Sequence, residues 1–181
     1  MKKILAALAV VLCFALPCLA DNFVTVNVYS GHSLVGGGTP YSGLVGTFTS
    51  PDIMFATGTG YAWHPFALPD FGADMFGQLL IPATGLYTFT LDSDDGSLLF
   101  IDGLLVVDDG GAHGPAVVSG SALLTAGVHP FEVQFFECCG GPSGVDLLLP
   151  TGVTYVPEPA SLLLVGTGLL ALGSRVRKLL G

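Results

Sequence analysis

Short apolar runs that alternate with polar positions and turn residues fill the middle of the chain, between residues 21 and 155. The segment FVTVNVY, Phe23 to Tyr29, alternates with a period of two, which is typical of a strand buried on one face. We find no helical periodicity in this region. Regularly spaced strands with turns between them are typical of an all-β sandwich or barrel. The pattern therefore predicts one all-β domain over residues 21–155, with no internal repeat and no linker.

Three pairs of apolar runs predict hairpins. The first joins MFGQLLI to LYTFTLD through a turn from Pro82 to Gly85, and the third joins VVSGSALL to HPFEVQFFE at Ala126-Gly127. The second joins LLFI to LLVV through Asp102-Gly103, a pair that suits the positive φ angles of a type I′ turn. A further strand is predicted at VDLLL, and short strands with long loops are predicted over the Gly-rich residues 30–69.

The first twenty residues have the order of a secretory signal peptide. Two lysines precede an apolar run from Ile4, and small residues precede Asp21. This order predicts that signal peptidase cleaves after Ala20. A lipoprotein site at Cys18 is the alternative, but Pro17 stands where such a site needs a small residue.

Residues 156–181 resemble a second targeting signal. The triplet Pro157-Glu158-Pro159 precedes an apolar run over about residues 160–174, and a basic end follows at residues 175–178. A helix of about 14 residues spans about 21 Å, so crossing the roughly 30 Å of bilayer hydrocarbon requires help from flanking residues. The basic end suits the cytoplasmic side. This order resembles the PEP-CTERM sorting tail of Gram-negative bacteria, which implies membrane insertion, processing by an exosortase and display or release at the cell surface.

Charge restricts the partners of the region between the two signals. No Lys or Arg occurs from Ile4 to Ser174, whereas acidic residues are frequent. Nucleic acid is excluded as a partner, because binding it requires neutralisation of phosphates by basic side chains. A cation or a neutral polymer such as a glycan fits this composition.

Four aspartates gather in TLDSDDGSLLFIDG, Thr90 to Gly103. Their spacing does not match a helix-loop-helix calcium loop. A glycosidase pair is also disfavoured, because the neighbours Asp94 and Asp95 and the pair Glu132 and Glu137 are each expected to point to opposite faces. We find no nucleophile elbow and no spaced metal-binding histidines, and so predict that the chain is not an enzyme.

The blocks from about Phe76 to Leu149 resemble the PA-14 (protective antigen) domain, a β-barrel module of bacterial toxins, glycosidases and yeast adhesins. The Tyr-Thr-Phe run, the Ser-Asp-Asp-Gly turn, the Ile-Asp-Gly hairpin and the Thr-Ala-Gly-x-His turn occur in order. In lectin members an aspartate pair joined by a cis peptide holds Ca²⁺, which ligates sugar hydroxyls. The resemblance implies this role for Asp94 and Asp95.

The second loop departs from the lectin members, which provide an Asn side chain and backbone carbonyls there. This chain offers ECCGGPSGVD, with no Asn. The replacements that we consider are the backbone carbonyls of Gly140, Gly141 and Ser143, and the Asp146 side chain.

Three neighbours of these loops have two interpretations each. Cys138 and Cys139 either form a vicinal disulfide, which would stiffen the loop and offer an apolar platform, or cross-link to another chain. Trp63 either stacks on a sugar or belongs to the core. His113 is either a hydrogen-bonding residue of its loop, which we prefer, or a ligand.

Taken together, these features predict an exported cell-surface or matrix module with Ca²⁺-dependent carbohydrate binding, of the lectin or adhesin kind. Its expected partners are an extracellular glycan or exopolysaccharide, with signal peptidase and an exosortase as processing enzymes. The alternative is a structural matrix or envelope protein in which the β-domain is a spacer.

Overall fold

The computed structural model describes residues 24–31, 42–55 and 63–156. These residues form strands, turns and loops, and none of them belongs to a helix that is long and apolar enough to cross a membrane. The predicted signal peptide with its cleavage site at Ala20 lies outside the described residues. The same holds for Pro157, Glu158 and Pro159 and for the apolar run that follows them.

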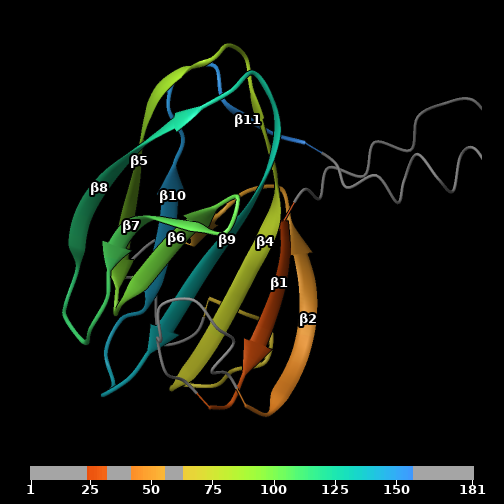
Figure 1. The fold of residues 1–181 in the computed structure, drawn as a ribbon. Helices are drawn as coiled ribbons and strands as arrows, with labels where there is room; N and C mark the ends of the chain where they lie inside the picture. Colours follow the sequence, from red (N-terminus) through yellow and green to blue (C-terminus); the bar gives the residue numbers. More distant parts are fainter. Residues whose placement is uncertain (1–23, 32–41, 56–62, 157–181) are drawn as a thin grey trace, which may run out of the picture.

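The strands form two antiparallel sheets (Figure 1). The seven-stranded sheet has the order β2 (Leu44–Ser50), β1 (Val24–Tyr29), β4 (Phe71–Ile81), β9 (Gly127–Glu137), β6 (Ser97–Ile101) and β7 (Leu104–Asp109), and β11 (Thr154–Val156) pairs with one end of β4. The four-stranded sheet has the order β3 (Met54–Phe55), β10 (Gly144–Leu148), β5 (Gly85–Asp94) and β8 (Ala116–Leu124). The all-β prediction is confirmed. The sheets do not close into a barrel, so the sandwich form of the prediction is the correct one.

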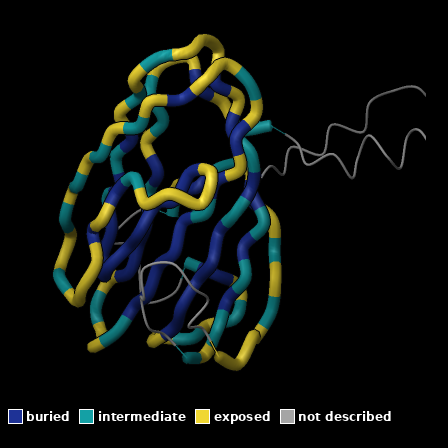
Figure 2. The backbone as a smooth tube through the Cα atoms, in the orientation of Figure 1, coloured by how far each residue is buried: buried dark blue, intermediate teal, exposed yellow. Residues whose placement is uncertain are grey.

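The core lies between the two sheets, as the dark blue segments of Figure 2 show. Alternate residues of each strand are buried there, and β1 follows the pattern most regularly: Val24, Val26 and Val28 are at most 1% exposed, and the residues between them are half-buried. The largest side chains in this core come from both sheets, with Phe71 and Phe135 from one and Phe89 from the other. The period of two read from the sequence therefore identifies the inner face correctly.

Two of the three predicted hairpins are wrong. β4 and β5 follow one another in the chain, yet β4 pairs with β1 and β9 in one sheet and β5 pairs with β8 and β10 in the other. β8 and β9 are likewise in different sheets. The short connections after Ile81 and Leu124 arch across the sandwich, whose two sheets must lie about 10 Å apart. Apolar alternation determines which face of a strand is buried and does not determine which strand it pairs with.

The hairpin of β6 and β7 is confirmed. Asp102 and Gly103 have φ angles of 54° and 75°, as a type I′ turn requires. The Asp102 carboxylate is also bound to the imidazole of His129, with 2.7 Å between Oδ2 and Nδ1. This contact ties the turn to β9.

At β7 and β8 the two sheets approach each other closely. Gly120 of β8 lies directly against the carbonyl oxygen of Val106 in β7, so that a Cβ atom at this position would overlap it. Only a residue without a side chain permits this approach.

Candidate metal centre

The Ser-Asp-Asp-Gly turn crosses from one sheet to the other. Asp94 is the last residue of β5, and the peptide bond between Asp94 and Asp95 is cis, as the family resemblance implies. The chain then enters β6, which pairs with β9. The backbone N–H of Phe136 donates to the Gly96 carbonyl at 3.1 Å. This pairing places the turn beside the end of β9.

Three carboxylates meet at this point. The ligand atoms of Asp94, Asp95 and Glu137 all lie within 4.8 Å of one another. Among the described residues, these three form a group that could hold a metal ion. Glu137 is the last residue of β9. The residues are 8%, 6% and 1% exposed, respectively, so solvent screens them weakly. No Lys or Arg occurs in the described part of the chain to neutralise them.

The Asp95 carboxylate is held from two directions. The backbone N–H of His113 donates to its Oδ1 at 2.8 Å, and the backbone N–H of Cys138 donates to its Oδ2 at 2.9 Å. One donor belongs to the loop after β7 and the other to the loop after β9. The orientation of Asp95 is therefore set by both loops.

Burial and the neighbouring carboxylates raise the pKa values of Glu137 and Asp94. Burial, followed by the carboxylates of Asp95 and Asp94, raises the pKa of Glu137 from 4.5 to about 8. Burial and the Asp95 carboxylate also raise the pKa of Asp94, and nearby His113 partly opposes this. Glu137 and Asp94 are therefore harder to ionise here than in water.

Two polar atoms near the cluster have no hydrogen-bond partner. They are Oε2 of Glu137 and Oγ of Ser143, and both residues are almost completely buried. Leaving such an atom unpaired in the interior costs about 1 to 3 kcal/mol. An ion with oxygen ligands would satisfy both atoms.

The candidate ligands of the second loop fall into two groups. Gly140, Gly141 and Ser143 belong to the loop that joins β9 to β10, and the residue after Ser143 pairs with Asp94 in the sheet. Asp146 lies further along β10, opposite Asp92 of β5. It alternates with the buried Val145 and so faces away from the core, and it does not belong to the three-carboxylate group.

Cys138 and Cys139 form a vicinal disulfide at the start of this loop, which agrees with the first of the two interpretations given above. His113 also has the preferred structural role: its ring nitrogens contact the carbonyl oxygens of Gly114 at 2.8 Å and of Asp109 at 3.1 Å. These contacts hold the loop whose backbone binds Asp95.

Trp63 packs into an aromatic cluster. Its ring is stacked on Phe55 at a centroid distance of 4.3 Å, and its edges contact Phe71 at 5.3 Å and Phe135 at 5.7 Å. Phe71 and Phe135 are fully buried. This packing favours the core interpretation of Trp63 over the sugar-stacking one.

Sequence reasoning did not find Glu137 as a member of the site. The sequence pairs Glu137 with Glu132 only as a possible catalytic pair, which is disfavoured because the two side chains are expected to point to opposite faces. The alternation along β9 agrees with this expectation. A signal was nevertheless present. In the strand FEVQFFE the inward positions are Phe131, Val133, Phe135 and then Glu137, so a carboxylate continues a row of buried apolar residues.

Comparison with known protein families gives two matches. The model of the PA14 domain matches residues 30–158, which is more than half of the chain, and the model of the PEP-CTERM protein-sorting motif matches residues 156–178. A search of curated proteins gives no significant match.

Solved structures with the same fold share little sequence with the chain. An anti-sigma factor domain-containing protein has a TM-score of 0.59 at 22% identity, over 76% of this chain and 46% of its own. The chain thus spans less than half of the length of that protein. The PA14 domain of the MpAFP antifreeze protein has a TM-score of 0.57 at 16% identity, over 76% of this chain and 87% of its own. The PA14 sugar-binding domain from an RTX adhesin has a TM-score of 0.55 at 17% identity, over 71% of this chain and 90% of its own.

Proposed function

This chain belongs to the PA14 domain family, and on that premise we propose that it is a surface-sorted module that binds carbohydrate through a calcium ion held by Asp94, Asp95 and Glu137. It is a binding module and not an enzyme. The sorting motif at residues 156–178 indicates export and surface sorting in bacteria. The proposals of calcium binding and of sugar binding are argued from the geometry of the carboxylate cluster.

The observation that carries the proposal is the cluster of three buried carboxylates in a described region that contains no Lys or Arg. At a separation of 4.8 Å and an effective dielectric constant of about 20, two unit charges repel by roughly 3 to 4 kcal/mol. The cluster contains three such pairs. A divalent cation bound between the carboxylates would replace this repulsion by attraction. Without a cation, the repulsion is relieved by protonation of Glu137.

The donor set suits calcium. Carboxylate, hydroxyl and carbonyl oxygens are hard ligands, and Ca²⁺ takes six to eight of them in flexible geometry. Further ligands that the proposal requires would come from the loop after Glu137, where Ser143 has an unpaired Oγ and Gly140 and Gly141 have backbone carbonyl groups. In this proposal Glu137 has the role that an Asn side chain has in the lectin members, in place of the Asp146 side chain that the sequence analysis considered. The vicinal disulfide offers an apolar surface beside the ion.

Sugar binding is supported by the open coordination positions that such an ion presents to vicinal hydroxyls, and by the likeness to a PA14 domain named as sugar-binding. The expected ligand is an extracellular glycan or exopolysaccharide. Signal peptidase and an exosortase process the chain at its two ends, and the apolar run of about residues 160–174 anchors it in the membrane of a Gram-negative bacterium before that processing.

Calcium binding is tested by thermal unfolding of the full chain, exported by a bacterial host and purified in mild detergent. Calcium at one hundred times its dissociation constant is expected to add about 2.7 kcal/mol to the stability of the parent. The double variant Asp94→Asn, Asp95→Asn is expected to lose this gain. Asp92→Asn, two residues earlier on β5, is the matched control and should keep it. If calcium does not stabilise the parent, Asp94 and Asp95 serve only to form the turn. This outcome would favour the alternative, a structural matrix or envelope protein.

Sugar binding is tested separately, on a glycan array probed with and without the calcium chelator EGTA. Binding to particular glycans that disappears in EGTA and in the double variant supports the proposal. A calcium-dependent stability gain without any glycan binding would support calcium binding and contradict the lectin function.

A further inference from the structure

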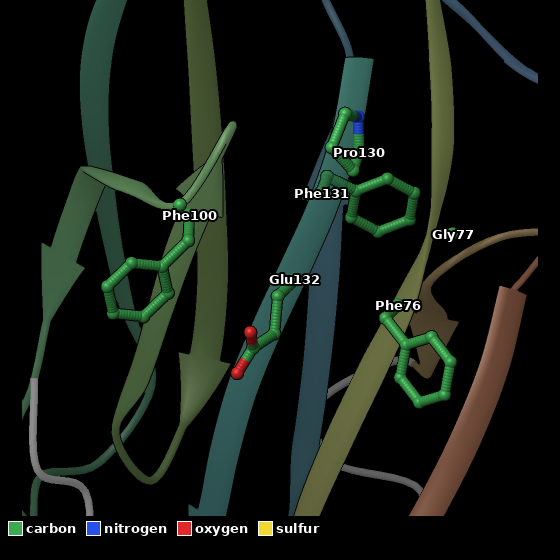
Figure 3. Close-up of a pocket in the computed structure, with 7 residues that line it drawn as sticks. Phe76, Gly77, Phe100, Pro130, Phe131 and Glu132 are labelled. Atoms are coloured by element: carbon green, nitrogen blue, oxygen red, sulfur yellow. The ribbon is translucent and has the colours of Figure 1, made fainter. Parts of the chain in front are cut away.

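A cavity lies on the face of β9 opposite to the one that carries the carboxylate cluster. Figure 3 shows it on the outer face of the seven-stranded sheet, with Glu132 between Phe76 of β4 and Phe100 of β6. In the sheet register, Glu132 is directly opposite both phenylalanines. The cavity has a volume of about 330 Å³, which is at the small end of the range for ligand pockets.

The walls of this cavity are apolar. Besides the two phenylalanines, they include Pro130, Phe131 and the backbone of Gly77 and Gly103. Among the lining residues, Glu132 alone has a polar side chain. A ligand that fits must therefore have an apolar portion that packs on the rings and one group that meets the carboxylate.

The unsatisfied polar atoms around Glu132 are all acceptors. The amide Nε2 of Gln134 donates to Oε1 of Glu132 at 2.6 Å, which leaves Oε1 of Gln134 without a partner although the residue is only 2% exposed. Asp74 is next to Gln134 in the register, its Oδ1 also lacks a partner, and the residue is 8% exposed. Neither Gln134 nor Asp74 lines the cavity, so the acceptor that a ligand meets there is the Glu132 carboxylate, which a hydrogen-bond donor would match.

The described part of the chain contains no Lys or Arg that would supply such a donor. Burial and the neighbouring Glu132 carboxylate raise the pKa of Asp74 to about 7, which shows the same shortage of positive charge as at the carboxylate cluster. A sugar hydroxyl both donates and accepts, and the side chains that line the cavity provide no donor for it. The composition of the cavity thus favours a cation with an apolar stem.

We propose that this cavity binds an arginine side chain of a partner polypeptide. The stem and the planar guanidinium pack between Phe76 and Phe100, a geometry in which a cation is attracted by the faces of the rings. The guanidinium forms a charge-assisted pair with Glu132. Its five N–H donors in a fixed fork suit a bidentate contact with this carboxylate, which a lysine ammonium makes with less geometric match.

The test is an NMR titration of the full chain in detergent micelles with N-acetyl-arginine amide, carried out in EGTA so that it does not depend on the calcium site. Resonances of Phe76, Phe100 and Glu132 are expected to shift. The citrulline analogue, which has the same shape without the charge, and the lysine amide are each expected to bind at least five times more weakly. Equal binding of citrulline or lysine would overturn the assignment to arginine.

The protein side of the contact is tested with Glu132→Gln, which keeps the shape and removes the charge, and with Phe100→Leu, which removes one ring. Both are expected to weaken arginine binding at least fivefold while the protein stays folded, and Asp92→Asn on the other sheet is expected to bind like the parent. Shifts confined to the region of Asp94 would contradict the proposal. So would shifts at Phe100 that glucose or glucosamine produces and arginine does not, because these would make the cavity a glycan subsite.

Discussion

The substitution Glu137→Gln is expected to act in opposite directions with and without calcium. Glutamine keeps the shape of the side chain and removes its charge. Without calcium, burial and the carboxylates of Asp95 and Asp94 raise the pKa of Glu137 from 4.5 to about 8. In the unfolded chain the pKa returns to its ordinary value, so folding at neutral pH requires Glu137 to take up a proton.

The size of this cost follows from the pKa difference. One pKa unit corresponds to about 1.4 kcal/mol, so at pH 7.5 the uptake of a proton costs roughly 4 kcal/mol. The sign is that of an acid with a raised pKa in the folded state: stability is fully present below about pH 4.5 and falls as the pH rises toward 8. Glutamine does not titrate and avoids this loss. The variant is therefore expected to be more stable than the parent at pH 7.5 in EGTA, and the difference is expected to vanish near pH 4.

The assay is thermal unfolding of the full chain, followed by circular dichroism in EGTA and in excess calcium. The parent should gain about 2.7 kcal/mol at one hundred times its dissociation constant, and the variant should gain less, because a neutral amide oxygen replaces a charged carboxylate ligand. A variant that is less stable than the parent in EGTA at pH 7.5 would refute the electrostatic reasoning. A variant that gains as much from calcium as the parent would refute the role of Glu137 as a ligand.

Two further predictions concern the scaffold. Gly120→Ala is expected to destabilise the protein by at least about 2 kcal/mol in chemical denaturation, because its methyl group would overlap the carbonyl of Val106, whereas Gly114→Ala, which meets nothing within 4 Å, should be nearly neutral. The hydrogen bond from the His129 imidazole to the Asp102 carboxylate is the main cause that raises the pKa of His129, so its stabilisation is present below pH 6.5 and declines as the pH rises above that value. The melting temperatures of the parent and Asp102→Asn should accordingly differ more at pH 6 than at pH 9, and an equal difference at both values would contradict this.

The parts of the fold that were predictable are those that local chemistry determines. Asp102-Gly103 specifies its own turn, so the β6–β7 hairpin follows from two residues. The connections after Ile81 and Leu124 contain similar turn residues, but they lead into the other sheet. That choice depends on how the two sheets bury their apolar faces against each other, which is a property of the whole domain and is not visible in a short segment.

The same distinction applies to the metal centre. Asp94 and Asp95 are adjacent in the sequence, and a family motif marks them. Glu137 joins them only because β6 and β9 are neighbours in the sheet and because Asp95 accepts a hydrogen bond from Cys138, 43 positions away. No local pattern reports such a contact. The inward position of a carboxylate at the end of an apolar strand was the available signal, and it becomes informative once the register is known.

The register of β4 also relates the candidate metal centre to the sorting motif. Val156, where that motif begins, is opposite Gln78, whereas Glu137 is opposite Phe71 at the other end of the same strand. Seven residues of antiparallel strand correspond to about 24 Å. Val24 lies opposite Gly77, and Figure 1 shows that both ends of the described chain leave from the same side of the sandwich. The carboxylate cluster and the start of the sorting motif therefore lie at opposite ends of β4.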